Sequence, residues 1–142
     1  MPLKMDVAAL EAFMAEVFPQ VDGDFAIDAV SEEEITMRLL VSERHLRPGG
    51  TVSGPSMFGL VDVAAYLLTL ANIGPEALAV TTNCAIDFMR KPVGDAPLVA
   101  RGRLLKLGRQ LSVTDVLVFS DGEEKPVARA SLTYALPPKP GR

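Results

Sequence analysis

The sequence is poor in cysteine and histidine and lacks a long apolar run, which argues against several kinds of metal site and cellular location. It contains one cysteine, Cys84, and one histidine, His45, so an internal disulfide is impossible and a zinc site built from these ligands is not expected. No apolar run reaches the roughly 20 residues that a membrane-spanning helix needs, and no basic stretch precedes an apolar run near the N-terminus. We therefore expect no membrane partner, no secretory signal and a cytoplasmic location.

Positive charge is also scarce. The chain has 14 Lys and Arg residues against 18 Asp and Glu, a net charge of -4, and no basic stripe with interleaved aromatic residues. This balance argues against a nucleic-acid partner, because neutralising phosphates requires clustered Lys and Arg. Apolar residues make up 49% of the chain and charged residues 23%. The composition therefore predicts one globular domain over residues 1–142.

Periodicity predicts one helix and two strands in the first third of the chain. In the N-terminal segment, residues 1–20, Asp6 can cap a helix whose apolar positions recur at helical spacing to about residue 18. Two strands follow at residues 25–30 and 34–41, and the second alternates between apolar and polar residues. Residues 45–53 contain proline and glycine and are expected to form a loop.

A second helix is predicted to begin at Gly54-Pro55 and to end near residue 73. It is apolar nearly all round, which indicates a buried helix. The remaining chain is predicted to form strands at residues 78–89, 98–107, 111–119 and 127–136, followed by a proline-rich tail at 137–142 that is expected to fray. Strict alternation in the first of these strands predicts one shared face for Leu78, Val80, Thr82, Cys84, Ile86 and Phe88.

This order of elements favours an α+β domain, with an antiparallel sheet wrapped around one long central helix. A sheet around a single helix leaves edge strands with unpaired backbone groups. Pairing two such edges would satisfy those groups. We therefore expect a homodimer with two-fold symmetry.

The most informative segment is residues 47–62, a glycine-rich loop followed by a helix with one carboxylate two turns inside it. A helix N-terminus offers unpaired amides, which can hold a carbonyl oxygen that becomes negative during acyl transfer. Gly54 lets a ligand approach the backbone closely. Asp62 is the only charged residue between Arg47 and Glu76. It is therefore either a general base or nucleophile, or a structural acid that pairs with an arginine or faces solvent.

This segment resembles the active-site segment of hotdog-fold acyl-CoA thioesterases of the phenylacetate-degradation (PaaI-like) type. Their motif is His-Gly-Gly followed by a helix with an Asp, and Gly54 and Asp62 match the first glycine and the Asp. Residues 80–90 look like the family strand that ends in Phe-Leu-Arg-Pro. The resemblance covers about residues 25–136. It implies the hotdog fold and hydrolysis of an acyl-CoA thioester.

Two motif positions differ from the family pattern, because Ser53 replaces the His and Pro55 replaces the second Gly. Proline has no N–H, so the Gly54 amide is left as the donor to the thioester carbonyl. The resemblance implies that Asp62, usually from the partner subunit, activates water or attacks directly, and that Thr81 lies near the attacking water. From the residues alone, Thr81 is also explained as an ordinary strand threonine and Ser53 as a helix N-cap.

The resemblance also suggests residues that bind substrate. Arg47 stands where many relatives carry an Asn, and Arg47 or Ser53 would orient the thioester or the water. Met57 and Phe58, together with Tyr66, are expected to line an apolar pocket for the acyl group.

Four further residues stand out. Two of them have both a functional and a structural explanation, and the other two are not expected to take part in catalysis. Arg90 and Lys91 precede Pro92 and would contact the phosphates of coenzyme A, or would simply occupy a solvated turn. His45 is expected at the surface, because no positioned catalytic partner is evident for it. Cys84 is expected to be a small buried apolar residue rather than a nucleophile.

The sequence thus predicts an enzyme that hydrolyses an acyl-CoA thioester to a free acid and coenzyme A. It would need no metal and no cofactor beyond the coenzyme A of its substrate, and would assemble as a homodimer or as a dimer of dimers. One alternative is a non-catalytic acyl-CoA-binding hotdog domain, which the altered motif supports. Another is a hotdog dehydratase or hydratase, a chemistry that typically needs a His and Asp pair.

Overall fold

The computed structural model describes residues 2–21, 23–94 and 96–138 of the 142-residue chain. Two α-helices and six strands lie within these residues, together with two short 3-10 turns, Pro19–Val21 and Glu43–His45. The helices are α1 (Val7–Val17) and α2 (Gly54–Ile73), and the strands are β1 (Phe25–Val30), β2 (Glu34–Leu39), β3 (Val80–Phe88), β4 (Leu98–Leu107), β5 (Leu111–Ser120) and β6 (Ala128–Ala135). Every predicted helix and strand is therefore confirmed, with small differences at the ends.

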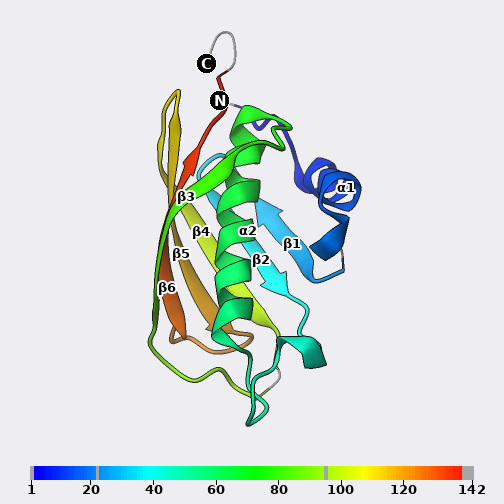
Figure 1. The fold of residues 1–142 in the computed structure, drawn as a ribbon, viewed down its shortest axis with the longest axis vertical. Helices are drawn as coiled ribbons and strands as arrows, with labels where there is room; N and C mark the ends of the chain where they lie inside the picture. Colours follow the sequence, from blue (N-terminus) through cyan, green and yellow to red (C-terminus); the bar gives the residue numbers. More distant parts are fainter. Residues whose placement is uncertain (1, 22, 95, 139–142) are drawn as a thin grey trace.

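The six strands form one sheet in the order β1-β2-β4-β5-β6-β3, and all neighbouring pairs are antiparallel. The sheet curves around α2, which packs against all six strands (Figure 1). This confirms the predicted α+β class with an antiparallel sheet around one central helix. The core lies between the helix and the concave face of the sheet, and Leu60, Leu67, Leu68, Leu98 and Leu132 are among its fully buried side chains.

Helix α2 begins and ends where its sequence predicts. The Ser53 side chain caps it by accepting a hydrogen bond from the Ser56 amide, and Pro55 lies in the first turn. Gly74, with φ of 95°, ends it. By length and composition alone α2 could cross a membrane, contrary to the expectation from the sequence, but 72% of its most apolar stretch is buried inside the fold. Packing within the sheet therefore accounts for its apolar character.

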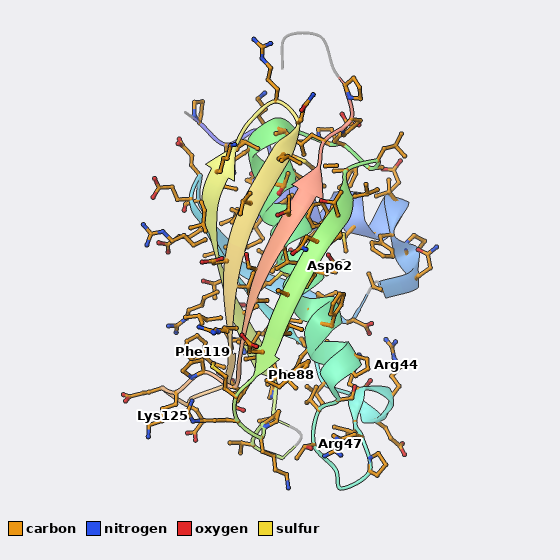
Figure 2. The ribbon with its side chains drawn as sticks, turned by 60° about the vertical axis from the view of Figure 1, so that its left-hand side comes forward. Arg44, Arg47, Asp62, Phe88, Phe119 and Lys125 are labelled. Atoms are coloured by element: carbon orange, nitrogen blue, oxygen red, sulfur yellow. The ribbon has the colours of Figure 1, made fainter. Side chains whose placement is uncertain are left out.

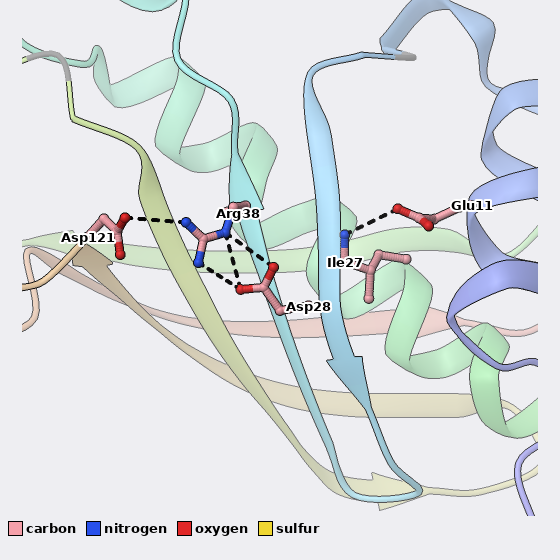
Figure 3. A network of polar contacts seen from close by, with 5 residues as sticks. All are labelled: Glu11, Ile27, Asp28, Arg38 and Asp121. Carbon is pink, nitrogen blue, oxygen red and sulfur yellow. Dashed lines mark hydrogen bonds and ion pairs between the residues drawn. The ribbon is translucent and has the colours of Figure 1, made fainter.

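The two edges of the sheet differ. At one edge, α1 packs against β1, and the Glu11 carboxylate accepts a hydrogen bond from the Ile27 amide at 3.5 Å (Figure 3). At the other edge, β3 pairs only with β6 within the described residues. The β3 edge therefore presents backbone groups to solvent that a further strand could pair with.

A group of charged side chains ties β2 to its surroundings on the outer face of the sheet. The Arg38 guanidinium donates to Asp28 on β1 and to Asp121 in the β5–β6 connection (Figure 3). These side chains are partly exposed, so each ion pair contributes at most about 1 kcal/mol. The network fixes the first hairpin to the far end of β5.

Two expectations from the sequence need correction, and a third is not tested. Strand β2 ends at Leu39 rather than at residue 41. In β3 the pairing with β6 shifts between Thr81 and Asn83, so the strict alternation expected there is wrong. The bulge inserts one extra residue, so Thr81 and Cys84 face the helix while Thr82 is exposed. Residues 139–142 of the expected tail lie outside the described residues.

Candidate active site

Asp62 lies on α2 and faces β3 and β6. Its Oδ1 atom accepts two short hydrogen bonds, one from Thr81 Oγ1 at 2.6 Å and one from Tyr134 Oη at 2.7 Å. Figure 2 shows Asp62 between the helix and the edge of the sheet, well away from the loop that contains Arg47. The structure thus brings together Asp62 and Thr81, two of the residues singled out in the sequence, and adds Tyr134.

The β3 bulge explains how Thr81 reaches Asp62. Thr81 pairs with Tyr134, and after the shift Cys84 pairs with Leu132, so all four side chains point toward α2. Without the extra residue, Thr81 and Cys84 would lie on opposite faces. A local irregularity of the backbone therefore places the Thr81 hydroxyl beside the carboxylate.

Asp62 is not explained as half of an ion pair. Within the described part of the chain, no Lys, Arg or His side chain forms a salt bridge with it, and no hydrogen bond to its Oδ2 atom is found. Its neighbours are hydroxyl groups instead. Of the two structural alternatives considered from the sequence, pairing with an arginine is therefore wrong for these residues, and a carboxylate that faces solvent in a gap stays an alternative, because Asp62 is only partly buried.

Asp62 borders a cavity of about 500 Å³. Thr81, Tyr134 and Tyr66 also line it, and the end of α1 closes it with Val17 and Phe18. Most of the lining side chains are apolar, while the polar groups gather at Asp62. Such a cavity, with a few convergent polar groups, is typical of a small-molecule site.

Burial and the neighbouring Asp62 charge raise the pKa of Tyr134 well above its ordinary value. Tyr134 therefore keeps its proton and acts as a donor throughout the physiological range. Burial and the same charge raise the pKa of the Cys84 thiol. Because the thiolate is the nucleophile, this environment supports the prediction that Cys84 is not one.

A second hollow lies at the start of α2. It has a volume of about 420 Å³ and is lined by Gly54, Pro55, Phe58, Ile86 and Phe88. A Cβ atom added at Gly54 would lie 3.3 Å from the tip of the Phe88 ring, so glycine permits this close approach. The hollow is almost entirely apolar, and it adjoins the open β3 edge.

The amides of the first helical turn are not equally available. The Ser56 amide donates to Ser53 Oγ at 3.3 Å, the Met57 amide donates to the Ser53 carbonyl at 3.1 Å, and Pro55 has no N–H. For the Gly54 amide, no acceptor is found among the described residues. It is therefore the amide that could bind a ligand oxygen.

Gly54 and Asp62 do not meet within one chain. Eight residues of α-helix separate them, which corresponds to about 12 Å along the axis. The cavity beside Asp62 and the hollow beside Gly54 share no lining residue. A site that uses both groups would have to combine two subunits.

The substrate-binding candidates near the start of α2 lie in different environments. Arg47 is exposed in the loop, and Ser53 is the helix N-cap, which is the structural explanation considered for it. Met57 is 4% exposed and belongs to the core, so it lines neither of the two cavities. Phe58 is 41% exposed and lines the hollow beside Gly54.

Arg90 and Lys91 both lie exposed just beyond β3. The Arg90 guanidinium donates to the Pro126 carbonyl at 2.9 Å, which fixes it against the β5–β6 connection. Its other N–H groups leave room for an additional acceptor.

His45 is buried, so its expected surface position is wrong. It is 6% exposed, and its Nδ1 atom accepts a hydrogen bond from the Ser42 amide at 2.9 Å. Its carbonyl oxygen accepts from the Ser53 amide at 2.8 Å and thereby holds the loop next to α2. A sole histidine in a loop gave no pattern from which this burial could be predicted.

Tyr134 is the important residue that sequence reasoning missed. It is 4% exposed on β6 and packs against Tyr66 with ring centroids 5.9 Å apart. A tyrosine in an alternating strand is typical of a core position, yet a buried phenol needs a partner for its hydroxyl. The need for such a partner was the one sign in the sequence that Tyr134 could belong to the site.

No metal site is evident in the described part of the chain. No three His, Cys, Asp or Glu side chains within residues 2–21, 23–94 and 96–138 are grouped so that they could hold an ion.

Comparison with known proteins defines the class. A family model described as the Thioesterase superfamily matches residues 49–127, more than half of the chain. The chain therefore belongs to the thioesterase superfamily, and its sheet around a central helix is the hotdog fold. The general reaction of this class is hydrolysis of a thioester.

Individual relatives agree with this class. A putative thioesterase from Silicibacter sp. TM1040 is 61% identical with a TM-score of 0.91, and the match covers 97% of this chain and 96% of that one. A mutant of the phenylacetic acid degradation protein PaaI from Thermus thermophilus is 27% identical with a TM-score of 0.72, covering 84% and 99%. A putative esterase of Thermoplasma acidophilum is 23% identical over 90% of each chain. The resemblance to PaaI-type thioesterases is thereby confirmed.

Proposed function

We propose that the protein hydrolyses acyl-CoA thioesters, with Asp62 as the general base. The main support is the position of Asp62, which lines a largely apolar cavity, accepts two hydroxyl hydrogen bonds and forms no salt bridge with a cation among the described residues. A carboxylate in such surroundings can accept a proton from water. Membership of the thioesterase superfamily gives the class of bond that is cleaved.

The proposed reaction is a single hydrolytic displacement. Asp62 takes a proton from a water molecule, and the water oxygen attacks the carbonyl carbon of the thioester. The carbonyl oxygen becomes negative and is held by a Gly54 amide. When the carbonyl re-forms, the carbon–sulfur bond breaks and the thiolate of coenzyme A takes the proton from Asp62. The products are a carboxylic acid and the coenzyme A thiol, and no additional cofactor is needed.

The separation of Gly54 and Asp62 supports a site shared between two subunits. Pairing of two β3 edges around a two-fold axis would run the two α2 helices antiparallel. In that arrangement, Gly54 of the partner subunit approaches Asp62. The open β3 edge and the apolar hollow beside it are the surfaces that such a homodimer would cover.

The substrate would lie across this shared site. The cavity beside Asp62 would take the acyl group against Phe18 and Tyr66, at the end of α1. Arg90 and Lys91, both exposed beyond β3, would contact the phosphates of coenzyme A. With these assignments the protein needs neither a nucleic acid nor a membrane, and we propose a cytoplasmic location.

The test measures release of free thiol from short, long and aromatic acyl-CoA substrates. Asp62→Asn keeps the shape of the side chain and removes the base, so turnover of the best substrate should fall about a hundredfold or more. Asp87→Asn is the control, because Asp87 is an exposed β3 carboxylate that pairs with Arg129 away from the cavity. Unchanged turnover in Asp62→Asn would contradict the proposal.

The altered motif favours one alternative, a domain that binds acyl-CoA without cleaving it. In that case acyl-CoA would bind to the wild-type protein in calorimetry while no thiol is released. Hydration of an enoyl-CoA would instead indicate a hotdog dehydratase or hydratase.

A further inference from the structure

We infer that Tyr134 is a positioning residue for Asp62: together with Thr81 it holds the Oδ1 atom, and it leaves Oδ2 as the oxygen that accepts the proton from water. This inference rests on the proposed role of Asp62 as the base. Tyr134 lies outside residues 49–127, the part of the chain that the family model matches. The shared family pattern therefore does not assign it a role.

The hydrogen-bond geometry favours the carboxylate as the acceptor for Tyr134. Tyr134 Oη lies 2.7 Å from Asp62 Oδ1 and 3.0 Å from the Asp62 backbone oxygen. A phenol has one proton to donate. The shorter contact is to a charged oxygen, and charge-assisted hydrogen bonds are shorter and stronger than neutral ones. The backbone oxygen also lies inside α2, where a helical amide four residues later is its usual donor.

Two donors on the same oxygen limit how Asp62 can move. Thr81 approaches from β3 and Tyr134 from β6, so the two bonds connect the helix to two adjacent strands. A carboxylate held by one donor can still turn and exchange its oxygens. With both donors present, the side chain keeps one orientation and Oδ2 stays available to a water molecule.

The ring of Tyr134 is itself fixed. It is 4% exposed and packs against Tyr66, which lines the same cavity. Its position therefore does not depend on the hydrogen bond to Asp62. Tyr134→Phe should keep this packing while removing one hydroxyl group, which makes it a clean test of the bond.

The experiment compares steady-state kinetics over pH for the wild type, Tyr134→Phe, Thr81→Val, Thr81→Ser and the double variant Tyr134→Phe/Thr81→Val. Each loss of a hydroxyl should lower kcat by on the order of tenfold, with little change in KM, and the double variant should lose more. Thr81→Ser should retain the wild-type rate.

Ser131→Ala is the control, since Ser131 also loses a hydroxyl on β6 but is exposed and does not line the cavity beside Asp62. It should leave kcat and the pH profile unchanged. Thermal melting of each variant separates loss of fold from loss of orientation, and Thr81→Val tests the same oxygen if Tyr134→Phe does not fold.

The outcomes distinguish the positioning role of Tyr134 from the proposed thioesterase function. An inactive Asp62→Asn with wild-type kcat and pH profile in both Tyr134→Phe and Thr81→Val would overturn the positioning role and leave the proposed function intact. A fully active Asp62→Asn would overturn the proposed function, and the positioning role with it.

Discussion

At the scale of single residues, His45, which holds the loop before α2, contributes to how stability depends on pH. Asp24 and His45 are 7% and 6% exposed, and Arg44 forms an ion pair with Asp24. Burial, and then the charge of Arg44, lower the pKa of His45 below its ordinary value of 6.5. The neutral ring is the form that can accept the Ser42 amide at Nδ1.

The sign of the effect follows from proton uptake. Between the lowered pKa of the folded state and 6.5, the unfolded chain binds more protons at this residue than the folded chain does. The contribution of the neutral His45 ring to the free energy of unfolding is therefore fully present above pH 6.5, and it falls as the pH drops toward the lower folded value.

We predict that His45→Asn makes the melting temperature less dependent on pH. Asparagine keeps an acceptor near the position of Nδ1 but cannot titrate. The wild type should be the more stable protein at pH 8, and the difference between the two melting temperatures should narrow by a few degrees at about pH 5.5. Differential scanning fluorimetry at both values measures it. A difference that is the same at both pH values would contradict the prediction.

Prediction from sequence reached some residues of the site and not others. Asp62 was visible because a lone charge on an apolar helix has to be explained. The family resemblance implied only that Thr81 lies near the attacking water. Its hydrogen bond to Asp62 was not predicted, because an extra residue in β3 decides which threonine faces inward. Tyr134 lies 72 residues from Asp62, and only the folded sheet brings the two together.

At the scale of elements, the order and type of the helices and strands were predictable because their periods and end residues agree. Ser53, Pro55 and Gly74 define α2 by local chemistry alone. The residues outside regular elements were harder to predict. His45 looked exposed in a loop, whereas tertiary contacts bury it.

The start of α2 can be tested at the same scale by substituting Gly54. In Gly54→Val the new side chain would occupy the hollow and press on the Phe88 ring, which is 3.3 Å from where a Cβ would lie. Phe88 is 52% exposed in the single chain, so its ring can move aside without disturbing the core of that chain, and sedimentation of the variant shows whether the dimer is kept. Gly54 is not among the glycines with positive φ, so valine adds no strain of that kind. The fold should therefore persist.

Turnover in Gly54→Val should fall by at least about a hundredfold, because blocking one oxyanion donor costs that much in other enzymes. Thermal melting beside the thiol-release assay measures both properties. Gly108→Val is the control, because a Cβ there would meet nothing closer than 3.8 Å, Gly108 is not among the glycines with positive φ, and it lies between β4 and β5 at the end of the sheet opposite Phe88. A stable and fully active Gly54→Val enzyme would show that this helix start does not hold the oxyanion.

At the scale of the whole molecule, Gly54 and Asp62 can form one active site only if two subunits come together. In one chain, Gly54 and Asp62 lie about 12 Å apart along a rigid helix. The open β3 edge and the apolar hollow lie on the same side of the chain, whereas α1 packs against the opposite edge of the sheet. The sequence indicated an unpaired edge but not which one, because that depends on where α1 packs.

We therefore predict that the protein sediments at micromolar concentration as a homodimer, with twice the 15.2 kDa chain mass, or as a dimer of dimers. Phe58→Asp should shift it toward monomer, because a charge would replace an apolar side chain in the hollow beside β3. Activity should fall with the dimer fraction, since neither chain alone would contain both Gly54 and Asp62 in one site.

Leu40→Asp is the matched control for Phe58→Asp. Leu40 is 42% exposed against 41% for Phe58, and it follows β2 on the far side of the sheet. It should leave both mass and turnover unchanged. A wild-type monomer with full activity would exclude the shared site, because one chain cannot bring an oxyanion at Gly54 within reach of a water bound to its own Asp62.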